Sequence, residues 1–334
     1  MTMMAASQVL ARDVAELVAA LKACTAACVI ALSPGDWRGV RIDRVQTHAT
    51  ISGQEAVLHD LRIANSSGIT LSNLELSTAS APSGNGSGGG DYRFQVLNAS
   101  NITFDRLRVH GDPRGTLQDT PSGLMIVGSS NVTVKNSDFT RLHHAIVFTN
   151  DSNIVLQKNA FHELYDDAMR GAEIHGLRID GNACYSNHPD LSDQDHPDCI
   201  QMWTARANSS SNNITITNNT FDRGSGHATQ FIFLGNESNL PYLNVVISGN
   251  KSYGALWNGL AITNGRDITI ADNQIMPSCR PDNGQMISSW VVTGAIQNLT
   301  IANNVAGKFA ERSLNPGKSQ YNNRISGCMD HSPF

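Results

Sequence analysis

The sequence predicts an all-β protein, a parallel β-helix built from stacked coils. The main observation is a repeated unit, a short alternating run of β-branched residues followed by an asparagine. The unit recurs at spacings of 23, 37, 31, 23 and 31 residues, which is typical of small coils with loops inserted between them. No helical period separates the runs, so turns are expected to join the strands. The repeated asparagines are Asn159, Asn182, Asn219, Asn250, Asn273 and Asn304.

Each of these asparagines is expected at the same corner of successive coils. There its amide can bond the backbone above and below, and asparagine tolerates the left-handed conformation that such corners need. Weaker copies of the unit begin at Gly68, Asn101 and Asn131, so we expect coils over residues 40–310. The whole chain, residues 1–334, is therefore predicted to be one domain, with residues 311–334 covering its C-terminal end.

One helix is predicted near the start of the chain. Residues 13–23 read DVAELVAALKA, with Asp13 at the N-cap and Glu16 at the spacing of a capping box. Because a solenoid must cover its open end, this helix is expected to act as an N-terminal cap.

Composition excludes several classes of partner. The net charge is −5 and no basic run is interleaved with aromatic residues, which argues against nucleic-acid binding. No apolar stretch is long enough for a membrane helix. Residues 1–6 carry no basic residue, so no signal peptide is recognisable at the start of the sequence.

The six cysteines suggest disulfides rather than a metal site. No pair has the C-x-x-C spacing of zinc or redox sites, and an even number allows three bridges. Sequence position favours Cys24–Cys28, Cys184–Cys199 and Cys279–Cys328, although six cysteines can pair in about fifteen ways. Disulfides would place the protein outside the cytoplasm, secreted or periplasmic.

The predicted site lies where the repeat departs from its own pattern. A second short run precedes each repeated unit, and the period of two makes half of its side chains face outward. In two neighbouring coils this outward column contains Arg170 and Gln201, which can both hydrogen-bond to a sugar. Polar residues crowd just before these runs, so histidines and carboxylates should meet at one edge beside Arg170. The expected outward column is Ile126, Val147, Arg170, Gln201, Ile232 and Ala261, and the polar residues before the runs are His143, His144, Asp166, Asp167, Asp195, His196 and Asp198.

The longest insertion falls at the same edge. It lies between Asn182 and Asn219 and contains two His-Pro-Asp triplets, at 188–190 and 196–198. A long loop on a regular scaffold is a common place for function. Trp203, Trp257 and Trp290 are candidate stacking platforms for sugar rings.

The repeat, the N-terminal helix and the Asn-x-Thr strand openings resemble a known group of proteins. They are similar to the right-handed, single-stranded parallel β-helix superfamily of pectate lyases, alginate lyases, chondroitinase-type lyases, mannuronan C5-epimerases and some glycosidases. The element Asp195-His196-Pro197-Asp198 is similar to a rearranged Asp-Pro-His-Asp motif of the epimerases. The resemblance implies a polysaccharide substrate, a Lys or Arg as base or acid (Lys158 or Arg170), and calcium as a candidate cofactor.

We therefore expect an extracellular polysaccharide lyase that cleaves a uronic-acid polymer of the alginate or pectate type by β-elimination. Such a reaction needs a cation at the uronate carboxylate, a base for the C5 proton and an acid for the leaving oxygen. The catalytic candidates are Arg170, His196, Asp198, His144 and Asp167, the substrate-binding candidates are Gln201, Trp203, His143, Tyr165 and Lys158, and the metal candidates are Asp195 and Asp166.

Three alternatives remain open at this point. A glycoside hydrolase could use a carboxyl pair such as Asp167 and Asp198 in adjacent coils. A C5-epimerase shares the first half of the elimination reaction and differs in how the carbon is reprotonated. A non-catalytic polysaccharide-binding β-helix needs neither base nor acid.

Overall fold

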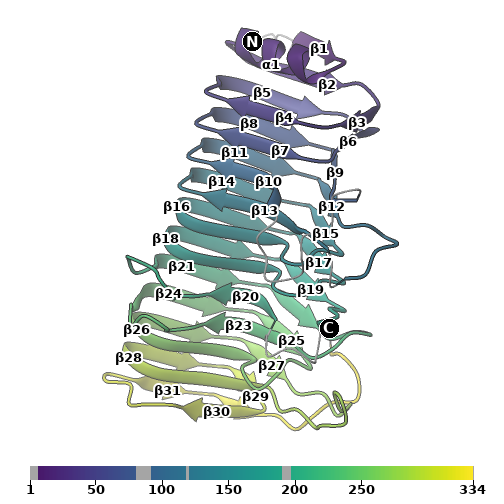
Figure 1. Cartoon of the computed structure of the whole chain (residues 1–334). Coiled ribbons are helices and arrows are strands. Elements are labelled where there is room, and N and C mark those ends of the chain that lie inside the picture. The colour runs from purple at the N-terminus through teal and green to yellow at the C-terminus, as the bar shows by residue number, and fades with distance from the viewer. Residues whose placement is uncertain (1–6, 80–91, 118–119, 190–196, 334) are drawn as a thin grey trace, which may run out of the picture.

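The chain folds into a parallel β-helix of stacked coils (Figure 1). The computed structural model describes residues 7–79, 92–117, 120–189 and 197–333. Each coil presents three strands, which we call faces A, B and C in chain order, and every strand pairs in parallel with its equivalent in the next coil. Faces A and B belong to one sheet of the described residues, because four long strands run across both, and face C forms the second sheet.

The strands of the three faces have the following bounds. Face A contains β4 (Val40–Asp43), β7 (Leu61–Ala64), β10 (Tyr92–Leu97), β13 (Ser122–Val127), β20 (Asp198–Met202), β23 (Gln230–Leu234) and β30 (Lys308–Glu311). Face B contains β1 (Ser7–Ala11), β2 (Ala27–Leu32), β5 (Gln46–Ser52), β8 (Ser67–Ser72), β11 (Ser100–Asp105), β14 (Ser130–Lys135), β21 (Asn212–Thr217), β24 (Tyr242–Ser248) and β31 (Ser319–Tyr321). The strands that cross both faces are β16 (Ile146–Gln157), β18 (Met169–Asp180), β26 (Leu260–Ala271) and β28 (Trp290–Ala302).

Face C consists of strands of only two or three residues. They are β3 (Gly35–Trp37), β6 (Ala56–Leu58), β9 (Glu75–Ser77), β12 (Arg108–His110), β15 (Asp138–Thr140), β17 (Ala160–His162), β19 (Ala183–Tyr185), β22 (Thr220–Asp222), β25 (Lys251–Tyr253), β27 (Gln274–Met276), β29 (Val305–Ala306) and β32 (Arg324–Ile325). Stacked side chains of all three faces fill the interior of the coils, as the Phe139 and Phe161 rings do with centroids 5.1 Å apart. The core is therefore a continuous column along the axis.

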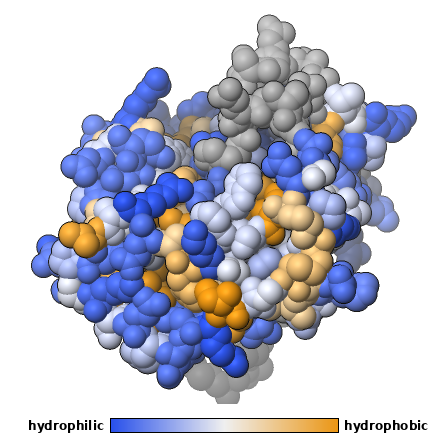
Figure 2. Space-filling model, turned by 90° about the horizontal axis from the view of Figure 1, so that it is seen from below, coloured by the Kyte–Doolittle hydropathy of each residue, from blue (hydrophilic) through white to orange (hydrophobic). Residues whose placement is uncertain are grey.

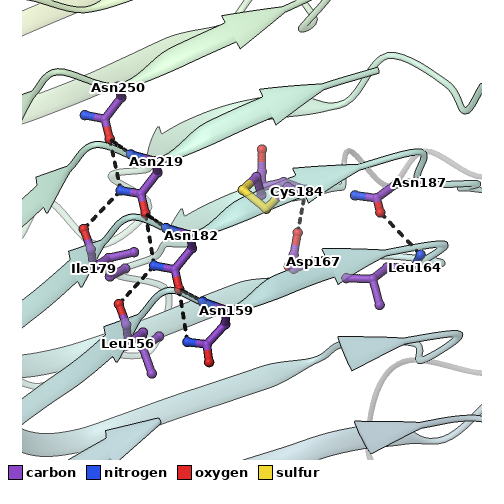
Figure 3. The surroundings of a disulfide bond; sticks show 12 residues. Leu156, Asn159, Leu164, Asp167, Ile179, Asn182, Cys184, Asn187, Asn219 and Asn250 are labelled. Carbon is purple, nitrogen blue, oxygen red and sulfur yellow. Dashed lines mark hydrogen bonds between the residues drawn. A yellow bond between two sulfur atoms is a disulfide. The ribbon is translucent and has the colours of Figure 1, made fainter. Parts of the chain in front are cut away.

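The repeated asparagines form the predicted ladder at the corner between faces B and C (Figure 3). Asn182 Oδ1 accepts from the backbone N and from Nδ2 of Asn159, while Asn182 Nδ2 donates to Leu156 O and to Asn219 Oδ1. One expectation was wrong: the ladder asparagines are not left-handed. The residue before each one has the positive φ instead, for example Lys158 at 54° and Gly181 at 67°.

Strand pairing extends beyond both limits that the sequence suggested for the coils. β2 already pairs with β5, and β31 and β32 pair with β28 and β29 beyond residue 310. Asn323 continues the ladder, since its Oδ1 accepts from the backbone N of Asn304 at 2.9 Å. The segment after 310 therefore contributes another coil.

The helix α1 (Val14–Ala23) lies at the N-terminal end of the stack (Figure 1). Asp13 is its N-cap and accepts from the backbone N of Glu16 at 2.8 Å, and Leu17 and Leu21 are buried. The strand β1 precedes the helix and pairs with β2. The capping role of α1 stays a prediction. At ten residues the helix is too short to span a membrane.

The three disulfides that sequence position favoured are confirmed as Cys24–Cys28, Cys184–Cys199 and Cys279–Cys328. The second joins β19 to β20 beneath the predicted site. The third joins the loop after β27 to the C-terminal segment. Figure 2 shows the molecule from below, where polar side chains dominate and apolar groups lie among them. Leu314 and Ile325, near the C-terminal end, are 87% and 65% exposed.

Candidate functional site

The loops that lead from face C to face A carry a polar cluster in successive coils. His143 and His144 lie between β15 and β16, and Asp166 and Asp167 lie between β17 and β18. Arg170 follows on β18. In the next coil, β20 begins at Asp198 and contains Gln201. Trp203 directly follows the last residue of β20.

The register places Arg170 beside Gln201 on neighbouring strands of face A, as the alternation predicted. At two other positions of the predicted outward column, the sequence analysis chose a residue one place away from the residue that the strand register puts there. Met125 and Phe233 pair with the column, whereas Ile126 and Ile232 are buried in the core. The alternation of side chains shows which residues of a strand share a face, but it does not show which residues of neighbouring strands lie side by side.

Arg170 connects the members of the cluster. Its Nη1 donates to His144 Nε2 at 2.9 Å and lies 3.2 Å from Asp167 Oδ2. Its guanidinium carbon lies 4.9 Å from the centroid of the Trp203 ring, within the range of a cation–π contact. Trp203 therefore supports Arg170, and its ring face toward Arg170 is not free to stack on a sugar.

His144 is a neutral imidazole in this environment. Burial is the main cause that lowers its pKa well below 6.5, and the charges of Arg170 and His143 lower it further. Because Nε2 accepts from Arg170, the proton of the neutral ring lies on Nδ1. Nδ1 lies 3.4 Å from Asp166 Oδ2 without a hydrogen bond between the two atoms, so Asp166 is a close neighbour of the ring and does not orient it.

The two carboxylates proposed for hydrolysis are both buried. Asp167 is 2% exposed and Asp198 is 0% exposed. Asp167 Oδ1 accepts from the backbone N of Asp198 at 2.8 Å, next to the Cys184–Cys199 disulfide (Figure 3), and Asp198 Oδ2 accepts from Gln201 Nε2 at 2.9 Å. Both side chains hold neighbouring groups in place, and neither presents a carboxylate to solvent.

His143 and Tyr165 form one wall of the cluster. Their rings stack with centroids 4.9 Å apart, and His143 meets His144 edge-on at 4.7 Å. Tyr165 is 8% exposed, so it contributes packing rather than an accessible hydroxyl face.

The sequence did not indicate Tyr92, at the start of β10, as a member of this cluster. Burial raises its pKa to about 12, against the opposing effects of the Arg170 charge and of a hydrogen bond with Ser122. Tyr92 pairs with Ser122 on β13, and β10 lies three coils before β18, the strand that contains Arg170. A Gly- and Ser-rich stretch precedes Tyr92 and interrupts the repeat, so its coil position could not be counted from the sequence.

Three of the predicted site residues do not join the described cluster. Lys158 is exposed at the corner between faces B and C, and it lines a groove with Asp138 and Arg108 on another side of the coil. Lys158 therefore lies apart from the other substrate-binding candidates. His196 and Asp195 lie outside the described residues.

The calcium expectation does not fit the donors that the structure brings together. His143, His144 and Asp166 offer ligand atoms within 4.8 Å of one another, but calcium prefers six to eight oxygen ligands. Two nitrogens and one carboxylate suit a transition metal better. Such a metal would need His144 Nδ1, the atom that carries the proton while Arg170 occupies Nε2. Asp195, the other predicted metal ligand, lies outside the described residues, so calcium stays a prediction.

The stacked coils and the asparagine ladder define the protein as a parallel β-helix. Comparison with known protein families assigns it to one of them. The family described as "Right handed beta helix region" matches residues 58–306, so the chain belongs to this family. The coils are therefore right-handed, as the resemblance implied. No curated protein matches the chain.

Several solved structures share the fold. PfbA, a surface adhesin of Streptococcus pneumoniae, has a TM-score of 0.60 at 14% identity and covers 95% of this chain and 93% of its own. A family 28 exopolygalacturonase of Yersinia enterocolitica has a TM-score of 0.56 at 11% identity, with coverage of 100% and 80%. A polygalacturonase of Erwinia carotovora has a TM-score of 0.53 at 15% identity, with coverage of 95% and 98%.

Proposed function

We propose that this protein is a secreted or periplasmic polysaccharide lyase that cleaves a uronic-acid polymer by β-elimination. The observation that carries the proposal is the contact between Arg170 Nη1 and His144 Nε2 at 2.9 Å. It joins a cation that can bind a carboxylate to a neutral imidazole that can accept a proton.

The chemistry of elimination requires this proximity. The proton to be removed is on C5, the carbon that bears the carboxylate, so the group that binds the carboxylate and the base must be neighbours. Arg170 is the accessible member of the pair, with 27% of its side chain exposed, while the side chain of His144 is 5% exposed. When Arg170 turns to a substrate carboxylate, His144 Nε2 becomes free to accept the C5 proton.

The remaining step is protonation of the leaving oxygen. The electrons of the C5–H bond form the C4–C5 double bond, the bond from C4 to the glycosidic oxygen breaks, and that oxygen takes a proton. Tyr92 is protonated at neutral pH, because burial raises its pKa to about 12. We assign it as the proton donor, with one product gaining an unsaturated ring and the other a new chain end.

The hydrogen bonds of the carboxylates favour elimination over hydrolysis. Both classes of glycoside hydrolysis need two carboxyl groups that reach the glycosidic bond or its attacking water. Asp167 accepts from the backbone N of Asp198, and Asp198 accepts from Gln201, so both carboxylates are engaged with protein groups. An epimerase would use the same base and cation, so its distinction from a lyase rests on the fate of the polymer.

Location outside the cytoplasm is supported by the disulfides. All six cysteines of the chain are paired, and such bonds persist in oxidising compartments.

The test is a panel of polygalacturonate, alginate and neutral polymers. The ultraviolet absorbance of the new double bond and the release of reducing ends are followed in parallel. A lyase raises both signals, whereas reducing ends alone would replace the proposal by hydrolysis. If neither signal rises, proton NMR of the recovered polymer separates an epimerase, which alters the sugar, from a binding protein, which leaves it unchanged.

The matched variants are Arg170→Gln and Arg266→Gln. Loss of a group that stabilises the developing charge typically costs a factor of about 100 or more in rate, so Arg170→Gln should lose nearly all activity with its fold intact. Arg266 is an arginine on face B with a more exposed side chain, 55% against 27% for Arg170, and its replacement should leave the rate unchanged.

A further inference from the structure

We propose that Arg41, Arg62 and Arg93 form an anion-binding lane, which holds the acidic groups of the polymer on the N-terminal side of Arg170. This inference rests on the proposed function for the identity of the polymer, but the lane can be tested by binding alone. It implies that the polymer lies along the axis of the β-helix, across successive strands of face A.

The register of face A aligns the lane with the site. The outward position occupied by Arg170 corresponds, coil by coil toward the N-terminus, to Val147, Met125, Gln95, Arg62 and Arg41. Neighbouring strands are about 4.8 Å apart, so Arg62 lies roughly 19 Å from Arg170 along the axis. One row of the sheet therefore leads from the catalytic cation to two further arginines.

A groove connects these arginines to the site. Arg41, Arg62, Arg93 and Gln95 line it together with Asp60 and Tyr92. Tyr92, the proposed proton donor, is thus one of the residues that line the groove.

The groove is positively charged although the protein is not. Among the residues that line it, three carry a guanidinium group and one, Asp60, carries a carboxylate, whereas the net charge of the chain is −5. Arg41 Nη1 holds Asp60 at 2.6 Å. Arg62 is exposed and makes no hydrogen bond or ion pair with any residue that the structure describes, so its donors are available to a ligand.

The opposite side of the site has a different character. Beyond Gln201 the same row continues as Phe233, Ala261 and Val292, and the last two are 1% and 2% exposed. This half of the row offers no charge to an acidic sugar. The lane is therefore one-sided, and the acidic groups farthest from the cleaved bond are held on the N-terminal side.

The lane predicts a polymer with repeated anionic groups, whether carboxylate or sulfate. Guanidinium groups form charge-assisted, paired hydrogen bonds with either anion. A ligand must span about four coils to reach Arg62 from Arg170, so the contribution of Arg62 should depend on chain length.

The experiment measures polymer binding in the Arg170→Gln background, so that cleavage does not consume the ligand. Arg62→Gln and Arg62→Gln/Arg93→Gln are compared with the control Arg266→Gln by affinity electrophoresis on polygalacturonate, dextran sulfate and uncharged dextran. Loss of Arg62 should weaken binding of an anionic polymer by about fivefold, and loss of both arginines by more. Binding of a galacturonate disaccharide should not change, and added salt should reduce the difference between variants.

Preference for polygalacturonate would identify the anion as carboxylate, and preference for dextran sulfate would identify it as sulfate. The lane is rejected if Arg62→Gln and the double variant bind both anionic polymers as tightly as the Arg266→Gln control does. The proposed function can fail separately. If binding of the polymer depends on Arg62 but the wild-type protein produces no double bond, the lane is supported and the lyase activity is rejected.

Discussion

At the residue scale, Asp151 is a buried carboxyl at the bend between faces A and B. It is 2% exposed and its Oδ1 accepts from the backbone N of Ser129 at 2.6 Å. Burial raises its pKa from 3.8 to about 7, against the opposing effect of its backbone hydrogen bonds. The folded state therefore holds a proton that the unfolded state has released between these two pH values.

The consequence is a loss of stability with rising pH. The folded pKa exceeds the unfolded value, so the free energy of unfolding falls as pH rises from about 4 to about 7 and is level above that. Asp151→Asn should remove this dependence and stabilise the protein at pH 8 by as much as about 4 kcal/mol, since one pKa unit corresponds to about 1.36 kcal/mol. Urea unfolding at several pH values measures the free energy of unfolding of the wild type and of Asp151→Asn. The control is Asp267→Asn, a substitution of an exposed carboxyl. A variant that is less stable at pH 8 than the wild type would contradict the prediction.

His144 makes a second prediction at this scale, for the pH dependence of the reaction. A base must be neutral to accept a proton, and burial lowers the pKa of His144 well below 6.5. The acid limb of kcat/KM for polymer cleavage should therefore lie below pH 6.5, with a level rate around neutrality. A pH–rate profile of the wild type measures this limb. A limb at or above 6.5 would exclude His144 as the base.

At the scale of the element, the asparagine ladder holds the coils in register. Asn219 is 0% exposed; its Oδ1 accepts twice from Asn182, and its Nδ2 donates to Ile179 O and Asn250 Oδ1. Asn219→Ala leaves several of these buried groups without partners, at about 1–3 kcal/mol each. It should lower the free energy of unfolding by about 3 kcal/mol or more.

The control for this variant is Asn212→Ala in the same coil. Asn212 is half-buried and bonds His175 at 2.8 Å, where water can replace the lost partner. Neither position has a positive φ, so alanine adds no backbone strain at either one. Thermal unfolding of both variants compares them, and similar melting temperatures would show that the ladder contributes no more than a surface amide.

The same elements show what could be predicted from the sequence. The ladder was readable because asparagine recurs at one corner, and Arg170 and Gln201 were placed together because strands alternate. Face C was not foreseen, since strands of two or three residues such as β17 are too short to display a period. Tyr92 was missed because it directly follows the Gly- and Ser-rich residues 78–91, where the repeat cannot be followed in the sequence. The hydrogen bond from Arg170 to His144 depends on side-chain geometry that spacing does not contain.

At the scale of the whole molecule, a stack of coils behaves as a one-dimensional array. Each coil pairs only with its neighbours, so a local change should spread over few coils. Two disulfides allow a comparison within the chain. Cys184–Cys199 spans 15 residues and joins β19 to β20 at the site, whereas Cys279–Cys328 spans 49 residues and holds the C-terminal segment against the loop after β27.

Replacement of each pair by serine should have a separate and local effect. Without Cys279–Cys328, amide hydrogen exchange should become faster in β30, β31 and β32, while polymer cleavage keeps its rate. Without Cys184–Cys199, the start of β20 with Asp198 loses its covalent support, so both cleavage and exchange protection in β18 and β20 should fall. Loss of a native disulfide typically costs 2–5 kcal/mol, which in an array appears first in the coils it touches. Loss of activity in the C-terminal variant, with exchange faster throughout the stack, would mean that the coils unfold as one unit.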